Sequence, residues 1–559
     1  MRPTVAVLVC FALYWIGYRF YARHLAHRVF RLDPARNTPA HQLSDGVDYV
    51  PSNKYVLFGH HYASIAGLSP MLGPAIAVIW GWLPALLWVV LGTLFIGAVH
   101  DFSALVISMR ARGMSVGKVA EDIIGPRAKT LFHILIFFLI ALAMGVFVNV
   151  AATLLSPAYN PEAAYPSATL MILAVALGWL IYKLKVPIGG ITLVAFAITL
   201  ISVWAGTRLP VPPLDLAQWS VVLLVYSFAA SVLPVWLLLQ PRDFINSLLL
   251  YLGLFSIFAG FFLLRPDFAA PAIQAHPQGA PPLFPFVFIV IACGAISGFH
   301  GLVSSGTTAK QINKETDASF IGYGGMIGES LLGLAAVLAC TAGFHSRDLW
   351  LSHYQSWNLA QGLGPNMKAF IDGSALFLNQ LGISMEFARA FVALVAISFA
   401  LTTLDSATRL LRFNIAEMGE TLKTPFLGNR YVASVLAVVT IGFFAFYKIG
   451  GKPAGLALWQ LFGTTNQVLG ALTLLTVTLY LMQRGRPYWY TAVPMVFMLV
   501  TTVAAMLIKI RDFWNVGTYL LFLLGGGILV LTIWLAVEAL LRLLKRRQTS
   551  SVGGALEGG

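Results

Sequence analysis

Long apolar runs separated by short polar segments organise almost the whole chain. A run of about 18 or more apolar residues is long enough to cross the hydrocarbon core of a bilayer as a helix. Fifteen runs reach or approach this length, so the sequence predicts an all-α polytopic membrane protein with about 15 transmembrane helices. The predicted spans are residues 3–20, 58–80, 83–108, 131–155, 168–184, 187–206, 217–239, 245–264, 284–309, 321–343, 386–410, 431–447, 455–482, 489–508 and 515–541.

The composition supports this class of protein. Hydrophobic residues make up 58% of the 559 residues and charged residues 10%, whereas a soluble domain is about a quarter charged. The net charge of +14 does not indicate nucleic-acid binding, because the basic residues recur between apolar runs. Cys10, Cys293 and Cys340 are scattered through apolar runs, which argues against a disulfide framework or a zinc motif.

The basic residues also set the predicted topology. If the segment after the first span is cytoplasmic, 26 of the 36 Lys and Arg residues fall on the cytoplasmic side and nine on the outside, with Arg389 inside a span. This asymmetry follows the positive-inside rule. It predicts an external N-terminus and a cytoplasmic C-terminus. The first span lacks a small-residue cleavage site, which favours a retained helix over a signal peptide.

The second span begins with an interrupted stretch, Gly59 to Pro74. It carries two prolines, interior glycines and two histidines, none of which a smooth membrane helix needs. Proline removes a backbone donor and clashes with the preceding turn. A broken membrane helix is typical of transporter binding sites, although a kinked, passive helix is the alternative.

The ninth span is interrupted in the same way, from Cys293 to Gln311. Its Gly, Ser, Thr and His residues indicate either a second break or close helix packing by small residues. The numbers of spans 2 and 9 differ by seven, and this odd offset means that they cross the membrane in opposite directions. Spans 2–6 and 9–13 therefore predict a five-plus-five inverted repeat with two broken helices.

This repeat divides the chain into segments. We predict an extra helix, a basic cytoplasmic loop, a first repeat, two connecting helices, a second repeat with an external loop, C-terminal helices and a disordered tail. The external loop has aromatic residues and a helix-like stretch from Met367 to Leu381, which favours an ordered lid. The segments are residues 1–22, 23–57, 58–206, 207–283, 284–482 (external loop 344–385), 483–547 and 548–559.

Ionisable residues inside spans are candidates for function because their burial in a bilayer is costly. His60 and His61 begin span 2, and His100 and Asp101 lie near the same side in span 3, so we expect the four to meet. Histidine–carboxylate pairs move protons near neutral pH and also bind metals. For these residues we rank proton transfer or substrate binding above metal binding. No histidine spacing suits a haem.

Span 11 carries a further polar group. Asp405 and Arg409 are four residues apart, which predicts an ion pair on one helix face. The alternative is a site for a coupling ion built from Thr402, Thr403, Asp405 and Ser406. Glu329 and the pair Glu386 and Arg389 are further candidates, and the polar stretch Phe462 to Gln467 is predicted to serve packing.

The substrate is expected between the two breaks, near the bilayer midplane. Pro74 suits the first position of a half-helix, whose free amides near Gly73 to Ile76 would attract a carboxylate. Hydroxyls from both breaks and a switchable donor, His300, would add contacts. The predicted substrate-binding residues are Ser64, Gly67, Ser69, Gly73, Phe299, His300, Ser304, Ser305 and Thr307.

These motifs together resemble the carbon-starvation CstA family. The resemblance rests on Gly59 to Pro74, His100-Asp101-Phe102, Ser297 to His300, Ser304 to Gln311, Thr402 to Ser406 and Phe462 to Gln467, and covers about residues 45 to 510. It implies a transporter of the bacterial inner membrane, made during carbon starvation, that imports peptides or pyruvate. It also implies a fold like that of the leucine transporter, in which span 11 lies against the first broken helix.

The sequence therefore predicts a secondary active transporter, not an enzyme. It has no nucleotide-binding loop and no soluble catalytic domain. We expect a small-molecule substrate, surrounding lipid and no nucleic-acid partner. No cofactor is predicted, and a proton is favoured over sodium as the coupling ion. The proton-coupling candidates are His60, His61, His100, Asp101, Thr402, Thr403, Asp405 and Ser406. The alternative is a membrane metal- or haem-binding redox protein that uses the histidines.

Overall fold

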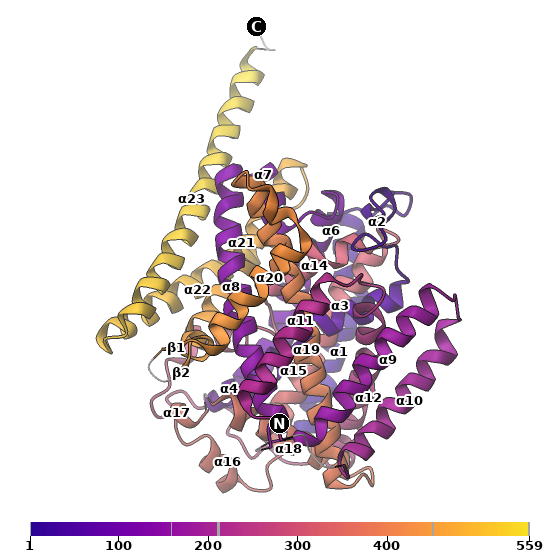
Figure 1. Cartoon of the computed structure of the whole chain (residues 1–559). Helices are drawn as coiled ribbons and strands as arrows, with labels where there is room; N and C mark the ends of the chain where they lie inside the picture. Colours follow the sequence, from indigo (N-terminus) through magenta and orange to yellow (C-terminus); the bar gives the residue numbers. More distant parts are fainter. Residues whose placement is uncertain (1, 158, 210–212, 361, 450–451, 557–559) are drawn as a thin grey trace.

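The computed structural model describes residues 2–157, 159–209, 213–360, 362–449 and 452–556, and these are mostly helical (Figure 1). The α-helices are α1 (Pro3–Ile16), α2 (Pro39–Gln42), α3 (Lys54–Ala66), α4 (Ser69–Ala77), α5 (Trp82–Leu87), α6 (Ala98–Arg110), α7 (Val116–Ile123), α8 (Pro126–Leu155), α9 (Ala164–Tyr182), α10 (Ile188–Gly206), α11 (Leu216–Val232), α12 (Leu239–Leu264), α13 (Leu283–Val290), α14 (Gly298–Gly306), α15 (Gly324–Ala342), α16 (Arg347–His353), α17 (Trp357–Ala360), α18 (Leu363–Asn379), α19 (Met385–Thr421), α20 (Arg430–Phe446), α21 (Ala454–Gln483), α22 (Trp489–Asn515) and α23 (Tyr519–Leu556). The strands β1 (Lys448–Ile449) and β2 (Lys452–Pro453) form a short antiparallel pair.

Several helices are continued by tighter or wider turns. The π-helical stretches are Gly17–Ala22, Leu25–Val29, Trp88–Gly97 and Ser319–Tyr323, and the 3-10 turns are Val78–Trp80, Pro161–Ala163, Thr308–Lys310 and Pro425–Gly428. They join neighbouring helices into longer rods, such as Pro3–Val29 and Trp82–Arg110. The rods are long enough to cross a bilayer, which their α-helical parts alone are not.

The multi-pass architecture is confirmed. Within the described residues, 11 helices are long and apolar enough to cross a membrane, or up to 12 if the bent pair α3 and α4 forms one span. The short apolar helices α11 and α20 and the interrupted pair α13 and α14 occupy the other predicted positions. A helix thus lies at every predicted run, whereas a total of 15 crossings stays a prediction.

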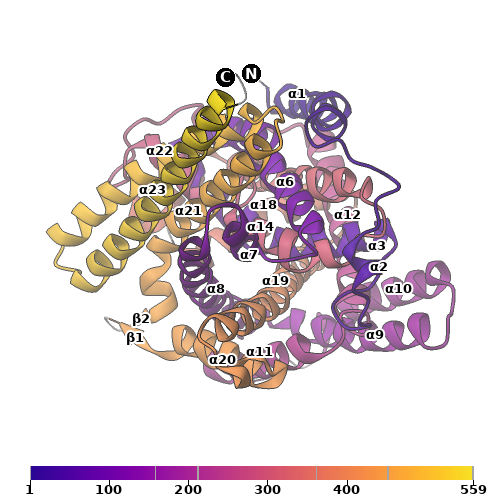
Figure 2. The same cartoon turned by 90° about the horizontal axis from the view of Figure 1, so that it is seen from above.

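The core is built around two long helices, α8 and α19. α19 packs against α8, α18, α20 and α11, and α8 also packs against α21 (Figure 2). Both helices are buried over most of their length, as expected for helices inside a bundle. The helices α9 and α10 lie at one edge of the molecule, and α22 and α23 lie at another. Apolar side chains such as Ile172 and Leu193 are exposed there, as lipid contact requires.

The two ends of the bundle differ. Figure 1 places α2 and α7 at the end nearest the C-terminus, and α16 and α18 at the opposite end with the N-terminus. The predicted basic loops and the predicted external loop are therefore on opposite sides, as the alternation of spans requires. Which end faces the cytoplasm stays a prediction.

The predicted lid is an ordered structure, and its helix is α18. It begins and ends slightly earlier than the predicted stretch. Trp350 Nε1 donates a hydrogen bond to the carbonyl of Cys340 at 3.1 Å, and the Tyr354 hydroxyl donates to the carbonyl of Ala75 at 2.7 Å. Both aromatic side chains are buried. The lid is thus fixed to α15 and to the end of α4.

One predicted boundary is wrong. The tail 548–559 was expected to be disordered, but α23 runs to Leu556, and only 557–559 lie outside the described residues. Once a helix has formed, each added residue brings one more hydrogen bond, so a long apolar helix extends easily into a polar tail.

Candidate functional site

The first break separates α3 from α4. Gly67 has a non-helical backbone, and the two helices are bent by 44°. The second half-helix begins at Ser69 with Pro70 in its first turn, where a missing amide costs little. Pro74 was predicted to begin it, but Pro74 lies inside α4. The free amides therefore lie one turn earlier than predicted, because Pro70 already starts the helix.

The second break is wider. Residues 291–297 separate α13 from α14 and are not helical. Asn466 of α21 caps the second half: its Oδ1 accepts from the amide of Phe299 at 2.9 Å, and its Nδ2 donates to Ser297 Oγ at 2.9 Å. The Gln467 side chain donates to the carbonyl of Phe288 at 2.8 Å. Asn466 and Gln467 thus hold the broken helix in place, in agreement with the packing role predicted for this part of the stretch.

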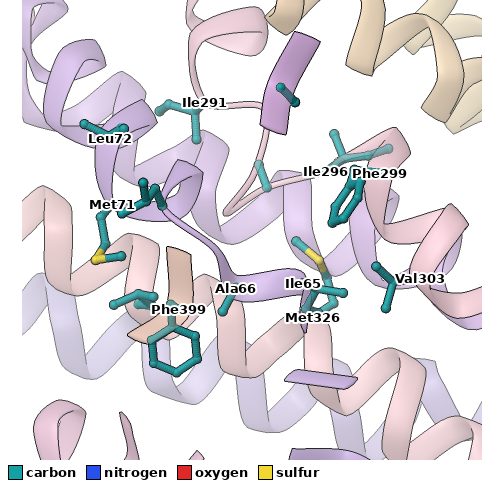
Figure 3. Close-up of a cluster of buried hydrophobic side chains, with 14 of the residues drawn as sticks. Ile65, Ala66, Met71, Leu72, Ile291, Ile296, Phe299, Val303, Met326 and Phe399 are labelled. Carbon is teal, nitrogen blue, oxygen red and sulfur yellow. The ribbon is translucent and has the colours of Figure 1, made fainter. Parts of the chain in front are cut away.

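The two broken helices run antiparallel to each other. A Cβ on Gly73 would lie 2.6 Å from the carbonyl oxygen of Val290, so α4 lies directly against α13. At the other end, His61 Nδ1 lies 2.9 Å from Thr308 Oγ1, which places α3 beside α14. Figure 3 shows apolar side chains of both breaks facing one another, including Leu72 and Ile291. Opposite directions for spans 2 and 9 are what an odd offset requires.

The helix α19 lies against the first break, as the resemblance implied. Thr403 Oγ1 donates to the carbonyl of Ser64 at 3.2 Å, and the hydroxyls of Ser64 and Ser406 are 2.8 Å apart. Thr402 Oγ1 accepts from Asn246 of α12 at 2.9 Å. A Cβ on Gly67 would lie 2.8 Å from Thr403 Oγ1, so this glycine permits the close approach.

A buried set of charges, which we call the His60 network, joins α3 to α12, α11 and α19. His60 Nδ1 lies 2.5 Å from Asp243 Oδ2, and Arg242 donates to Asp243 Oδ1 at 2.6 Å. Arg242 also pairs with Asp405, and the Tyr226 hydroxyl donates to Asp405 Oδ2 at 2.5 Å. All four charged side chains are fully buried.

The predicted ion pair between Asp405 and Arg409 is wrong. Asp405 pairs with Arg242, while Arg409 Nη1 donates to Asp48 at 2.7 Å in the loop before α3. Helix spacing places the two side chains near each other, but both find better partners on other segments. Burial raises the pKa of Asp48, yet the nearby Arg409, Arg412 and Lys310 lower it more, so its pKa is below the usual value.

A second buried set, which we call the His300 chain, crosses three helices. His100 Nδ1 lies 2.8 Å from Asp101 Oδ1, and Asp101 Oδ2 lies 3.1 Å from His300 Nδ1. His300 Nε2 lies 3.3 Å from Glu329 Oε1 of α15. The four residues expected to meet do not form one group: His100 pairs with its neighbour Asp101, His60 pairs with Asp243, and His61 lies beside Thr308.

A cavity of about 110 Å³ opens between the breaks and the lid. Its polar lining includes Ser69, Thr464 and Lys509, and its aromatic lining includes Trp357 and Trp459. Two of the predicted substrate-binding residues, Ser69 and Gly73, line this cavity.

The other predicted substrate-binding residues lie elsewhere. Ser305 lines a smaller cavity of about 20 Å³ near Glu417, and His300 belongs to the His300 chain. The remaining residues are buried near the two breaks: Ser64, Gly67, Phe299, Ser304 and Thr307.

Several residues of the site were not found from the sequence. Arg242 and Asp243 precede the expected start of span 8, so they were assigned to a loop, but α12 begins at Leu239. Tyr226 lies inside a predicted span, and Lys509 follows directly after the end of another, so neither was singled out. Adjacent opposite charges beside a span were the one available signal for Arg242 and Asp243. Arg389, which was a further candidate together with Glu386, bonds Asp372 at 2.8 Å.

Comparisons with known proteins cover nearly the whole chain. Residues 3–348 and 351–505 match the family model described as carbon starvation protein CstA. The peptide transporter CstA of Campylobacter jejuni is 33% identical over 91% of this chain and 80% of its own length. The peptide transporter CstA of Escherichia coli is 32% identical over 90% and 80%, respectively. The pyruvate/proton symporter BtsT of Escherichia coli is 31% identical over 90% and 81%.

Solved structures give weaker matches. MhsT in complex with L-phenylalanine is 12% identical, with a TM-score of 0.45, over 87% of this chain and 99% of its own. The manganese transporter of Eremococcus coleocola, bound to an aromatic bis-isothiourea compound, is 16% identical, with a TM-score of 0.43, over 90% and 99%.

Proposed function

Because the chain belongs to the carbon starvation protein CstA family, we propose that it is a secondary active transporter that imports peptides or pyruvate together with protons. The names of its relatives, peptide transporter and pyruvate/proton symporter, support this class of substrate and of coupling ion. We place it in a bacterial inner membrane, with the N-terminus outside and the C-terminus in the cytoplasm.

One observation carries the proposal: two antiparallel helices are broken side by side. Gly73 of α4 lies against Val290 of α13, and a cavity adjoins both breaks. Non-helical backbone at membrane depth is tolerated where it lines a cavity or is buried in protein. Paired broken helices supply that backbone in transporters built from inverted repeats. We therefore propose that spans 2–6 and 9–13 form a five-plus-five repeat.

The cavity suits a small carboxylate. It is an order of magnitude larger than the roughly 10–15 Å³ that one water needs. The start of α4 at Ser69 presents the positive end of a helix dipole, and Lys509 adds a positive charge to the lining. Trp357 and Trp459 offer apolar contacts for the rest of the substrate. Both pyruvate and a peptide C-terminus carry the required carboxylate, and in this conformation the volume favours pyruvate.

We assign proton coupling to the His60 network by its charge balance. Arg242 supplies one positive charge against the carboxylates of Asp243 and Asp405. A proton on His60 balances the second negative charge, and its loss leaves one net charge in a buried site. Uncompensated buried charge is costly. Because His60 belongs to α3, its proton controls how firmly the first broken helix holds α12.

Sodium is the other candidate ion, and Thr402, Thr403 and Ser406 would be its ligands. Each of these hydroxyls already bonds another protein group: Thr402 donates to Ser398 at 2.9 Å, Thr403 to Ser64, and Ser406 pairs with Ser64. This use favours a packing role for the three hydroxyls and protons as the coupling ion.

The experiment is uptake into proteoliposomes that contain the purified protein. Labelled pyruvate, a dipeptide and a tripeptide are offered under an inward proton gradient, an inward sodium gradient or no gradient. We expect accumulation of pyruvate or peptide with the proton gradient alone. Accumulation that needs sodium and ignores the pH gradient would contradict proton coupling. Absence of uptake of all three substrates under any gradient would contradict the assigned substrates.

A further inference from the structure

In the His300 chain, the facing atoms of His300 and Glu329 both present lone pairs. Asp101 accepts from His300 Nδ1, which places the ring proton on that nitrogen. Nε2 of the neutral ring is then an acceptor, and it faces the acceptor Glu329 Oε1 at 3.3 Å. Neither this nitrogen nor either oxygen of Glu329 has a hydrogen-bond partner in the described residues. Two buried acceptors that face each other repel, and either a proton or a metal ion between them removes this repulsion.

Cys293 decides which kind of cation fits. Its Sγ, a ring nitrogen of His300 and a carboxylate oxygen of Glu329 all lie within 4.8 Å of one another, and all three residues are buried. A proton needs no sulfur nearby. A thiolate, an imidazole and a carboxylate are the three ligand types that zinc takes in proteins. Soft sulfur ligands select transition metals over magnesium or calcium.

We propose that Cys293, His300 and Glu329 bind one divalent transition-metal ion, with zinc as the best match. Tetrahedral ligands at about 2.1 Å lie about 3.4 Å apart, close to the 3.3 Å between His300 Nε2 and Glu329 Oε1. Binding exchanges the thiol proton for the metal, and this proton leaves to water. The dication then balances the two anionic ligands, which suits burial.

The surroundings complete such a site. Asp101 bonds the far nitrogen of His300, the usual second partner of a metal-bound histidine. Cys293 also lines the cavity of about 110 Å³, which offers an entry path and room for water as a fourth ligand. A catalytic or exchangeable zinc site keeps one such open position.

The ion would restrain the second broken helix. Cys293 belongs to the non-helical stretch, His300 to α14 and Glu329 to α15. A metal ion bound to all three residues fixes the non-helical stretch and α14 against α15. A bound metal is therefore expected to inhibit movement of the second broken helix. This consequence rests on the proposed transport function, whereas metal binding does not.

The test uses the full-length protein in detergent, freed of metal with a chelator and titrated with Co²⁺. We expect about one Co²⁺ per chain, with the near-ultraviolet absorption of a sulfur-to-cobalt bond, and displacement by Zn²⁺. C293S should lose this absorption. C340S is the matched control, because Cys340 is also buried and free but does not belong to the three-residue group. D101N should weaken binding by about 10–100-fold.

Size-exclusion chromatography of each variant checks that it is folded. Absence of stoichiometric Co²⁺ binding by the folded wild-type protein would overturn the metal site and leave a proton between His300 and Glu329. Sulfur-to-cobalt absorption that persists in C293S would also overturn it. Neither result changes what the uptake experiment measures, so failure of the metal site and failure of the transport function are distinguishable.

Discussion

His60 Nδ1 lies 2.5 Å from Asp243 Oδ2, and this contact ties the first broken helix to α12. Asp243 in turn bonds Arg242, which also pairs with Asp405 of α19. Three helices therefore meet at one buried set of charges beside the first break. In the proposed coupling, a change in the charge of His60 would act on all three helices at once.

Replacing Arg242 with Gln should destabilise the protein strongly. The change leaves Asp243 and Asp405 buried without their cation, and breaking a buried pair costs about 3–5 kcal/mol. Thermal unfolding in detergent measures the loss. The double variant R242Q/D405N removes one of the stranded charges and should recover part of the stability. A double variant no more stable than R242Q would contradict the pairing of Arg242 with Asp405.

Replacing Asp48 with Asn should also destabilise the protein, but by an amount that does not vary with pH between about 5 and 8. The folded pKa of Asp48 is lowered, so its stabilising effect is complete above the unfolded pKa of about 3.9 and is lost only as pH falls through the folded value. Unfolding of wild type and D48N across this range checks it. A difference that shrinks by pH 5 would contradict the lowered pKa.

Replacing Gly73 with Ala should impair uptake and lower stability together. The new Cβ would lie 2.6 Å from the backbone oxygen of Val290, closer than real Cβ contacts come, so α4 and α13 must separate. If Gly73 mattered only because it lines the cavity, the G73A variant would lose uptake but keep its full stability. Yield of folded protein and uptake per folded molecule are measured together. G428A is the control, because no atom lies within 4 Å of a Cβ added at Gly428. Normal uptake and normal stability of G73A would contradict the close packing of α4 against α13.

Reporter fusions test the orientation in the membrane. Fusions after Arg36 and after Arg547 should both report the cytoplasm, because 26 of the 36 basic residues fall on that side. Figure 1 places α2 and the C-terminus at the same end of the bundle, so the two fusions must agree. An external signal at either position would contradict the topology and the inverted repeat built on it.

The sequence predicts well those features that depend on a single helix, namely its position and its breaks. Apolar runs mark the predicted spans, Gly and Pro mark the first break, and Gly with Ser and Thr marks the second, because these signals are local. Even so, Pro74 was preferred to Pro70 as the start of the second half-helix, since both residues fit the first turn and only packing decides. The lid helix was found because its polar and apolar residues alternate with the helical period.

The sequence did not predict which charged residues pair between different segments. Helix spacing paired Asp405 with Arg409, whereas the fold pairs Asp405 with Arg242 and Arg409 with Asp48. A single sequence gives periodicity along a helix but not the rotation of one helix relative to its neighbours. The contact of Thr403 with Ser64 was anticipated only because the family resemblance supplied that rotation.

The central claim is that protons enter together with the substrate and that His60 carries them. The most direct measurement is substrate-driven proton movement in proteoliposomes, followed with a pH-sensitive dye trapped inside, in wild type and in H60Q. Glutamine keeps a hydrogen-bonding side chain but carries no proton, and H41Q is the matched control because His41 is exposed. We predict that pyruvate acidifies the interior with wild type and H41Q, and that H60Q exchanges labelled pyruvate without acidification. Proton movement by H60Q equal to that of wild type would contradict the claim.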